Sequence, residues 1–144
     1  MAAIESAIAD LYRLANNPLV HRARAERIGT ELSRTELEAL RRVDELGAGA
    51  TVTAMSETLG LSLAATSRAL ARLEADGHLE RLTDPADGRV ARFELTRRGR
   101  TTRDRFQAST RSEVAHVLSN WSASDRSDLA ELFGRLVRQM QGER

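Results

Sequence analysis

Residues 77–99 read GHLERLTDPADGRVARFELTRRG, and this stretch decides the fold. Near its middle, Asp87-Gly88 is a favoured turn for a tight β-hairpin. In residues 91–95 apolar and charged side chains alternate, which predicts a strand with one buried and one solvated face. Arginines stand on both sides of the turn, at Arg81 and Arg89. The stretch therefore predicts a short, basic, two-stranded β-ribbon.

A predicted helix over residues 62–76 comes immediately before the ribbon. Ser62 is a good N-cap for this helix, and Gly77 suits the position just past its C-terminus. Further upstream, residues 51–53 can add a minimal third strand, and Thr53 is expected to cap a short helix over residues 54–59. A helix, a tight turn, a second helix and then a β-ribbon form the order of a winged helix-turn-helix.

Helical spacing divides residues 62–76 into two faces. Thr66, Leu70 and Leu73 form the line expected to be buried. The opposite face carries small residues and two arginines, namely Ala64, Ser67, Arg68, Ala71 and Arg72. Arg68 or Arg72 can pair with guanine or hold a phosphate, and alanine methyls can touch thymine methyls. The helix N-terminus at Ser62 can receive a phosphate. An ordinary solvated helix face is the alternative reading of this helix taken alone.

The ribbon tip and the charge distribution also point to duplex DNA. Arg89 beside the turn can enter a minor groove, and Asp87 either shapes the turn or orients Arg89. Residues 62–111 hold eleven arginines and seven acids, whereas residues 1–61 and 112–144 each have an excess of acids. All 22 basic residues are arginine, which either serves phosphate and guanine recognition or reflects codon usage.

The remaining segments read as helices. One helix is expected from Ile4 to Ala15 and a second to about Ile28, with Asn17 as N-cap of the second. Residues 33–36, Ser-Arg-Thr-Glu, form a capping-box pattern that opens a helix ending near Leu46. A long polar helix is expected to begin near Thr96 and to turn apolar at Val114, Val117, Leu118 and Trp121. A last helix is expected to be capped near Ser124.

Apolar stripes mark the first and last helices. The residues that form them are Ile4, Ile8 and Leu11 in the first helix and Leu129, Leu132, Phe133, Leu136, Val137 and Met140 in the last. The two stripes either pack on each other within one chain or are covered by a second copy. Because a chain of 144 residues has little else to cover both, an intertwined homodimer is favoured.

The predicted fold class is mainly α with a small β-wing. A winged helix-turn-helix core over residues 33–99 is flanked by dimerisation helices over residues 1–32 and 100–144, all in one compact chain. About 41% of the residues are apolar, which is enough for a core. No apolar run approaches the length of a membrane span and no signal peptide is recognisable, so a cytoplasmic protein without a membrane partner is expected.

Several motifs, in this order along the chain, resemble the multiple-antibiotic-resistance regulator (MarR) family: Leu59-Gly60-Leu61-Ser62, Thr66-Ser67-Arg68, Arg72-Leu73-Glu74, Gly77, Arg81, Asp87, Arg89, Leu95-Thr96 and Gly99. The resemblance implies a homodimeric transcription regulator that binds a pseudo-palindromic operator of double-stranded DNA. It further implies a repressor that releases DNA when a small anionic or aromatic ligand binds. The DNA contacts that it implies are Ser62, Ala64, Ala65, Ser67, Arg68, Arg72 and Arg89.

One departure from the family qualifies the DNA contacts that the resemblance implies. Leu63, Ala64 and Ala65 stand where the family commonly has polar or basic residues, so direct base reading is expected to be sparser. In the family the effector pocket lies between the dimerisation helices and the winged unit. The candidate lining residues here are Tyr12, His21, Arg22, Phe106 and the residues near Phe106 and Thr110.

Other classes of function find little support. The three histidines lack metal-ligand spacing and the chain has no cysteine, so no metal, disulfide or cofactor is expected. No phosphate loop, nucleophile elbow or paired carboxylates appear, so an enzyme is not expected. The main alternative is a winged-helix protein-interaction module, an antirepressor or adaptor that does not bind DNA.

Overall fold

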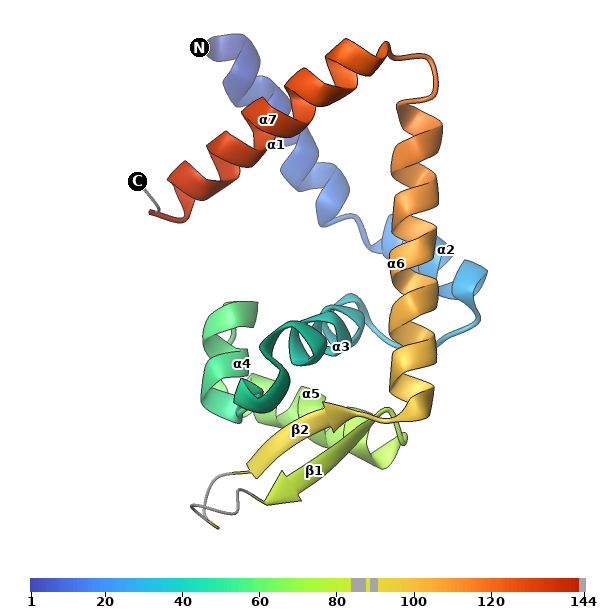
Figure 1. Ribbon diagram of the computed structural model, residues 1–144, viewed down its shortest axis with the longest axis vertical. Helices are drawn as coiled ribbons and strands as arrows, with labels where there is room; N and C mark the ends of the chain where they lie inside the picture. Colours follow the sequence, from blue (N-terminus) through green and yellow to red (C-terminus); the bar gives the residue numbers. More distant parts are fainter. Residues whose placement is uncertain (84–87, 89–90, 143–144) are drawn as a thin grey trace. The chain divides into compact units, whose positions relative to one another are not determined.

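The computed structural model describes residues 1–83, 88 and 91–142. Their contacts divide the chain into two compact units, Met1–Ser109 and Thr110–Arg144. The helices of the first unit are α1 (Ala2–Ala15), α2 (Pro18–Ile28), α3 (Arg34–Leu46), α4 (Val52–Leu59) and α5 (Leu63–Ala75), with a short 3-10 turn at Gly47–Gly49. Strands β1 (Leu79–Thr83) and β2 (Ala91–Leu95) follow, then α6 (Arg97–Val117) and α7 (Ala123–Met140) (Figure 1).

Side-chain caps set several of these helix starts. Asn17 accepts a hydrogen bond from the amide of Leu19, with Pro18 in the first turn of α2, as predicted. At α3 the predicted capping box is confirmed, because Ser33 Oγ accepts from the Glu36 amide and a Glu36 oxygen accepts from the Ser33 amide. The expected break between the first two helices is therefore present.

Two predicted caps are wrong. Thr51, rather than Thr53, caps α4 by accepting a hydrogen bond from the amide of Ala54. Ser122, rather than Ser124, caps α7 by accepting from the amide of Asp125. In both cases two hydroxyl residues stand two positions apart, and the earlier one takes the cap. The helix therefore gains two more residues at its start.

The winged unit is built around one apolar core. Helices α3, α4 and α5 contribute Leu40, Met55 and Leu70, and β2 contributes Phe93, all fully buried. In Figure 1 these three helices lie beside the β1–β2 hairpin, which is the wing of the fold. The two strands pair antiparallel, with Leu79 opposite Leu95. The mainly helical fold with a small wing is thus confirmed.

The predicted third strand is reduced to a single residue. Thr51 forms one antiparallel bridge to Arg92, while the amide of Phe93 donates to the carbonyl of Ala50. Val52 and the residues after it are helical, so the segment cannot extend further along β2. This bridge anchors the beginning of α4 to the wing.

Candidate nucleic-acid interface

Helix α5 has the two faces expected of a recognition helix. Thr66, Leu70 and Leu73 are completely buried against the core, as the helical spacing predicts. The Ser62 hydroxyl accepts a hydrogen bond from the Ala65 amide at 3.2 Å and so caps the helix. The aligned peptide dipoles of the helix give its N-terminus a partial positive charge, which stabilises an anion bound there.

The exposed face of α5 consists of small residues and one uncommitted arginine. Ala64, Ser67 and Ala71 are exposed, whereas Ala65 is half-buried. Within the part of the chain that the structure describes, Arg68 makes no ion pair or side-chain hydrogen bond and extends into solvent. A surface of this kind allows close approach to a groove and leaves one guanidinium available for DNA.

Arg72 is held by the protein itself. Its Nε lies 3.2 Å from a carboxylate oxygen of Glu36 and 4.0 Å from one of Asp76. Glu36 belongs to the first turn of α3 and is only 4% exposed. Arg68 and Arg72, for which the sequence predicts the same role, therefore have different surroundings.

Arg81 connects the wing to the recognition helix. Its Nε lies 3.3 Å from the Glu74 carboxylate of α5, and its guanidinium lies 5.1 Å from the centre of the Phe93 ring. A cation above an aromatic face adds a modest attraction, so both contacts hold β1 against α5 and β2. The other two wing predictions, Asp87 and Arg89, lie outside the described residues.

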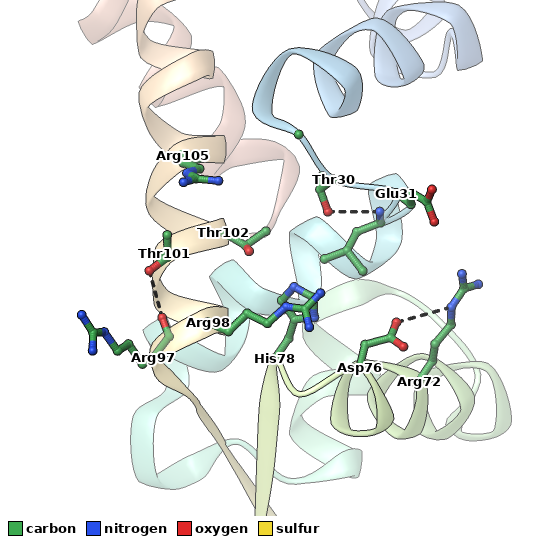
Figure 2. Close-up of a pocket in the computed structure, with 12 residues that line it drawn as sticks. Thr30, Glu31, Arg72, Asp76, His78, Arg97, Arg98, Thr101, Thr102 and Arg105 are labelled. Carbon is green, nitrogen blue, oxygen red and sulfur yellow. Dashed lines mark hydrogen bonds and ion pairs between the residues drawn. The ribbon is translucent and has the colours of Figure 1, made fainter.

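A basic cavity of about 810 Å³ lies beside the C-terminal end of the recognition helix. Its lining combines the segment between α2 and α3, the end of α5 and the first turns of α6. The charged and titratable residues that line it are Glu31, Arg72, Asp76, His78, Arg97, Arg98 and Arg105. Figure 2 shows the Arg98 guanidinium beside His78, while Arg97 points to the other side of α6. Because Arg97 points away and Arg72 is paired with Glu36, Arg98 and Arg105 supply the positive charge that favours an anion in this space.

His78 lies at the floor of this basic cavity and is almost completely buried. Its Nδ1 has no hydrogen-bond partner among the described residues. Burial lowers the pKa of the imidazole, and the Arg98 charge lowers it further against the opposite effect of Asp76 and Glu36. The ring is therefore held neutral, with one nitrogen unused.

The residues predicted for an effector pocket do not form one group. His21 and Arg22 line a separate hollow of about 700 Å³ beside α2, where His21 Nε2 lies 2.6 Å from the Ala15 carbonyl oxygen. Tyr12 and Phe106 line neither this hollow nor the basic cavity. Phe106 packs against the core and lies 5.8 Å from the Arg24 guanidinium.

One feature of the sequence points to some of the cavity residues that were not predicted. Arg97 and Arg98, which line the cavity, fall in the first turn of α6, where the helix dipole disfavours cations. The burial of His78 depends on how β1 packs and has no local signature.

The residues predicted for a dimer interface are open to solvent in the single chain. Within the described residues of α1 and α7, none is buried. Ile4, Leu132 and Met140 are more than half exposed, and Ile8 and Leu136 are partly exposed.

Comparisons with known proteins agree with this geometry. The model of the MarR family matches residues 32–91, which include α3, α4, α5 and β1. An uncharacterized HTH-type transcriptional regulator, YxaD of Bacillus subtilis (strain 168), is 31% identical over 121 residues, which are 84% of this chain and 81% of the relative. The chain belongs to the MarR family.

Solved structures carry the same fold. A MarR transcriptional regulator from Methanosarcina mazei Go1 matches with a TM-score of 0.80, at 19% identity, over 100% of both chains. A probable transcriptional regulator from Pseudomonas aeruginosa matches with a TM-score of 0.66, at 28% identity, over 90% of this chain and 96% of the other. As a MarR protein, this chain is a DNA-binding transcription regulator with a winged-helix fold.

Among the residues described, no cluster of His, Asp or Glu has the size needed to hold a metal ion. Over the same residues, every helix is too short or too polar to span a lipid bilayer.

Proposed function

We propose that this MarR protein acts as a homodimer on a pseudo-palindromic operator and represses transcription until a small anion binds. One observation carries the dimer. The terminal helices α1 and α7 each have an apolar stripe that their own unit leaves exposed. Contiguous exposed apolar surface of this kind usually marks an interface with another protein.

A second copy of the chain is the partner that fits these stripes. A two-fold axis through such an interface presents two identical recognition helices to the duplex. Half-sites are then expected about one helical turn apart, roughly 10–11 base pairs between centres. In each half-site Ser62 and Arg68 of α5 approach one major groove, and Arg89 of the wing approaches the neighbouring minor groove.

The interface is tested by placing a charge in the α7 stripe. Leu136→Arg is expected to give a monomer in sedimentation velocity and to lose cooperative binding to a two-half-site duplex. Ser127→Arg adds the same charge to the exposed opposite face of the same helix and should leave the dimer intact. A Leu136→Arg protein that remains a stable dimer contradicts this assignment of the interface.

DNA binding itself is tested by titrating duplexes from the region upstream of the gene at two salt concentrations. Phosphate neutralisation makes affinity fall steeply as salt rises. Salt-sensitive binding at micromolar protein supports the regulator. Its absence favours the adaptor without DNA binding.

The basic cavity supports the proposal that the ligand is an anion. Arg98 and Arg105 supply positive charge, the α6 N-terminus adds amide dipoles, and the unused nitrogen of His78 offers one further hydrogen bond. A carboxylate or phosphate can use all three. An occupied cavity changes the surroundings of Arg72 on the recognition helix, which links the ligand to DNA release.

Benzoate and inorganic phosphate serve as probes of this cavity. An anion that binds the cavity should raise the thermal midpoint of the wild-type protein and release a bound duplex. Arg98→Gln should abolish both effects. Arg111→Gln, which removes an exposed arginine of α6 that does not line the cavity, should retain them. Equal responses in the two variants would show that the cavity is not the anion site.

A further inference from the structure

Glu36 uses its two carboxylate oxygens for two different parts of the fold. Oε2 accepts a hydrogen bond from the Ser33 amide at 2.7 Å and completes the capping box of α3. Oε1 lies 3.2 Å from Nε of Arg72 in the last turns of α5. A single buried side chain therefore joins the start of α3 to the recognition helix.

In this ion pair the Glu36 carboxylate is buried, whereas the Arg72 side chain is 64% exposed. A carboxylate with 4% exposure has lost most of its water and needs a cation to offset the loss. Arg72 supplies that cation through its Nε, which also lies 4.0 Å from the Asp76 carboxylate. Turning Arg72 toward a DNA phosphate would leave the buried carboxylate without its partner.

The orientation of Arg72 agrees with a role as partner of Glu36. Arg72 lines the basic cavity together with Asp76 and His78, and Figure 2 shows it on the cavity side of α5. Arg68, one turn earlier, has no acidic partner in the described part of the chain. Only Arg68 of the two is uncommitted.

We propose that Glu36 and Arg72 act on DNA binding as a positioning pair that fixes the recognition helix against α3, and that Arg72 does not itself bind DNA. The inference rests on the proposed function, since it concerns how α5 is held for the operator. Arg68 then provides the arginine contact from α5 to DNA, and Arg72 keeps α5 aligned against α3.

Charge alone predicts the opposite result for one variant. Glu36→Gln removes a negative charge, so electrostatics alone would strengthen binding to the DNA polyanion. The positioning pair predicts weaker binding by about tenfold, because the ion pair that aligns the helix is lost. Glutamine also serves in a capping box, so α3 should remain capped. Glu31→Gln removes an exposed acid that is close in the sequence but outside the pair, and it is the matched control, with affinity equal to or above that of the wild type.

Salt dependence separates positioning from phosphate contact. Each phosphate contact contributes roughly 0.9 to the slope of log affinity against log salt. Arg72→Gln should weaken binding about tenfold with an unchanged slope. In contrast, Arg68→Ala should reduce the slope by about one if Arg68 holds a phosphate. If Arg68 instead reads a guanine, its variant should relax the preference at one base pair.

The double variant Glu36→Gln/Arg72→Gln guards against misfolding, because it leaves no buried charge unpaired. Its affinity should equal that of either single variant, since both remove the same interaction. Circular dichroism of each variant verifies the fold before binding is measured. The pair is confirmed by weaker, non-additive binding at constant slope.

If the wild type binds DNA, two results would contradict the positioning pair and leave the proposed function standing. One is a Glu36→Gln protein that binds as tightly as the wild type or more tightly. The other is a slope that falls by about one in Arg72→Gln. A wild type without salt-sensitive binding overturns the proposed function, and with it this inference.

Discussion

Replacement of Gly99 by alanine tests how α6 is joined to the wing. Gly99 is buried in the first turn of α6, and its amide donates to the Thr96 hydroxyl at 3.0 Å. A Cβ at this position would overlap the His78 carbonyl oxygen and lie 3.0 Å from its carbonyl carbon and 3.3 Å from Leu95 Cδ2. Ordinary carbon contacts are about 3.5–4.0 Å, so the helix or the strand must move.

The cost of Gly99→Ala follows from what that movement disturbs. The His78 carbonyl accepts from the Thr96 amide at 3.1 Å and from its hydroxyl at 3.2 Å. Weakening such bonds costs about 0.5–1.5 kcal/mol each, and overpacking a core costs about 1–3 kcal/mol. A loss near 3 kcal/mol is therefore expected, which is a large part of a typical stability of about 5–15 kcal/mol.

Urea unfolding followed by far-UV circular dichroism, at one protein concentration, measures this loss. Gly49→Ala is the matched control, because a Cβ at Gly49 meets nothing within 4 Å. The control should leave stability unchanged or raise it slightly. A Gly99→Ala protein within about 0.5 kcal/mol of the wild type would show that the contact with His78 is not tight.

Further predictions concern the pH response and the helix cap. Because burial and Arg98 lower the pKa of His78 against Asp76 and Glu36, the unfolded chain takes up a proton first as pH falls below 6.5. The unfolding free energy should therefore decrease below that pH, and His78→Gln should reduce the decrease measured by urea unfolding across pH; an unaltered pH profile would contradict this. Ser62→Ala should lose about 1 kcal/mol of stability with its cap. Ser62→Asp should keep that stability but bind DNA more weakly in a duplex titration, because the added negative charge repels a phosphate at the N-terminus of α5. Unchanged binding would show that no phosphate binds there.

Local patterns predicted the elements of the fold well. The capping box at Ser33, the Asn17 cap and the buried line of α5 each depend on residues within two turns of one another. Such signals are complete in the sequence, because both partners lie in the same short stretch. Where two hydroxyls compete, as at Thr51 and Thr53, the sequence does not rank them.

The partners of charged side chains were much harder to predict. The sequence identifies Glu36 as part of a capping box but gives no sign that it also binds Arg72, which is distant in the chain. The neutral, buried His78 likewise depends on three other elements packed around it. Long-range ion pairs follow from tertiary placement, which spacing within one helix cannot reveal.

These long-range pairs change how the basic character of the winged segment should be interpreted. Arg72 offsets a buried acid, and Arg81 binds Glu74 and covers Phe93, so both stabilise the winged unit. An excess of arginine in residues 62–111 therefore overstates the number of side chains available to DNA. Arg68 and the capped N-terminus at Ser62 are the groups of α5 that remain available. With alanines around Arg68, a large share of affinity should come from phosphates and groove shape, and base preference should concentrate where Arg68 meets the duplex.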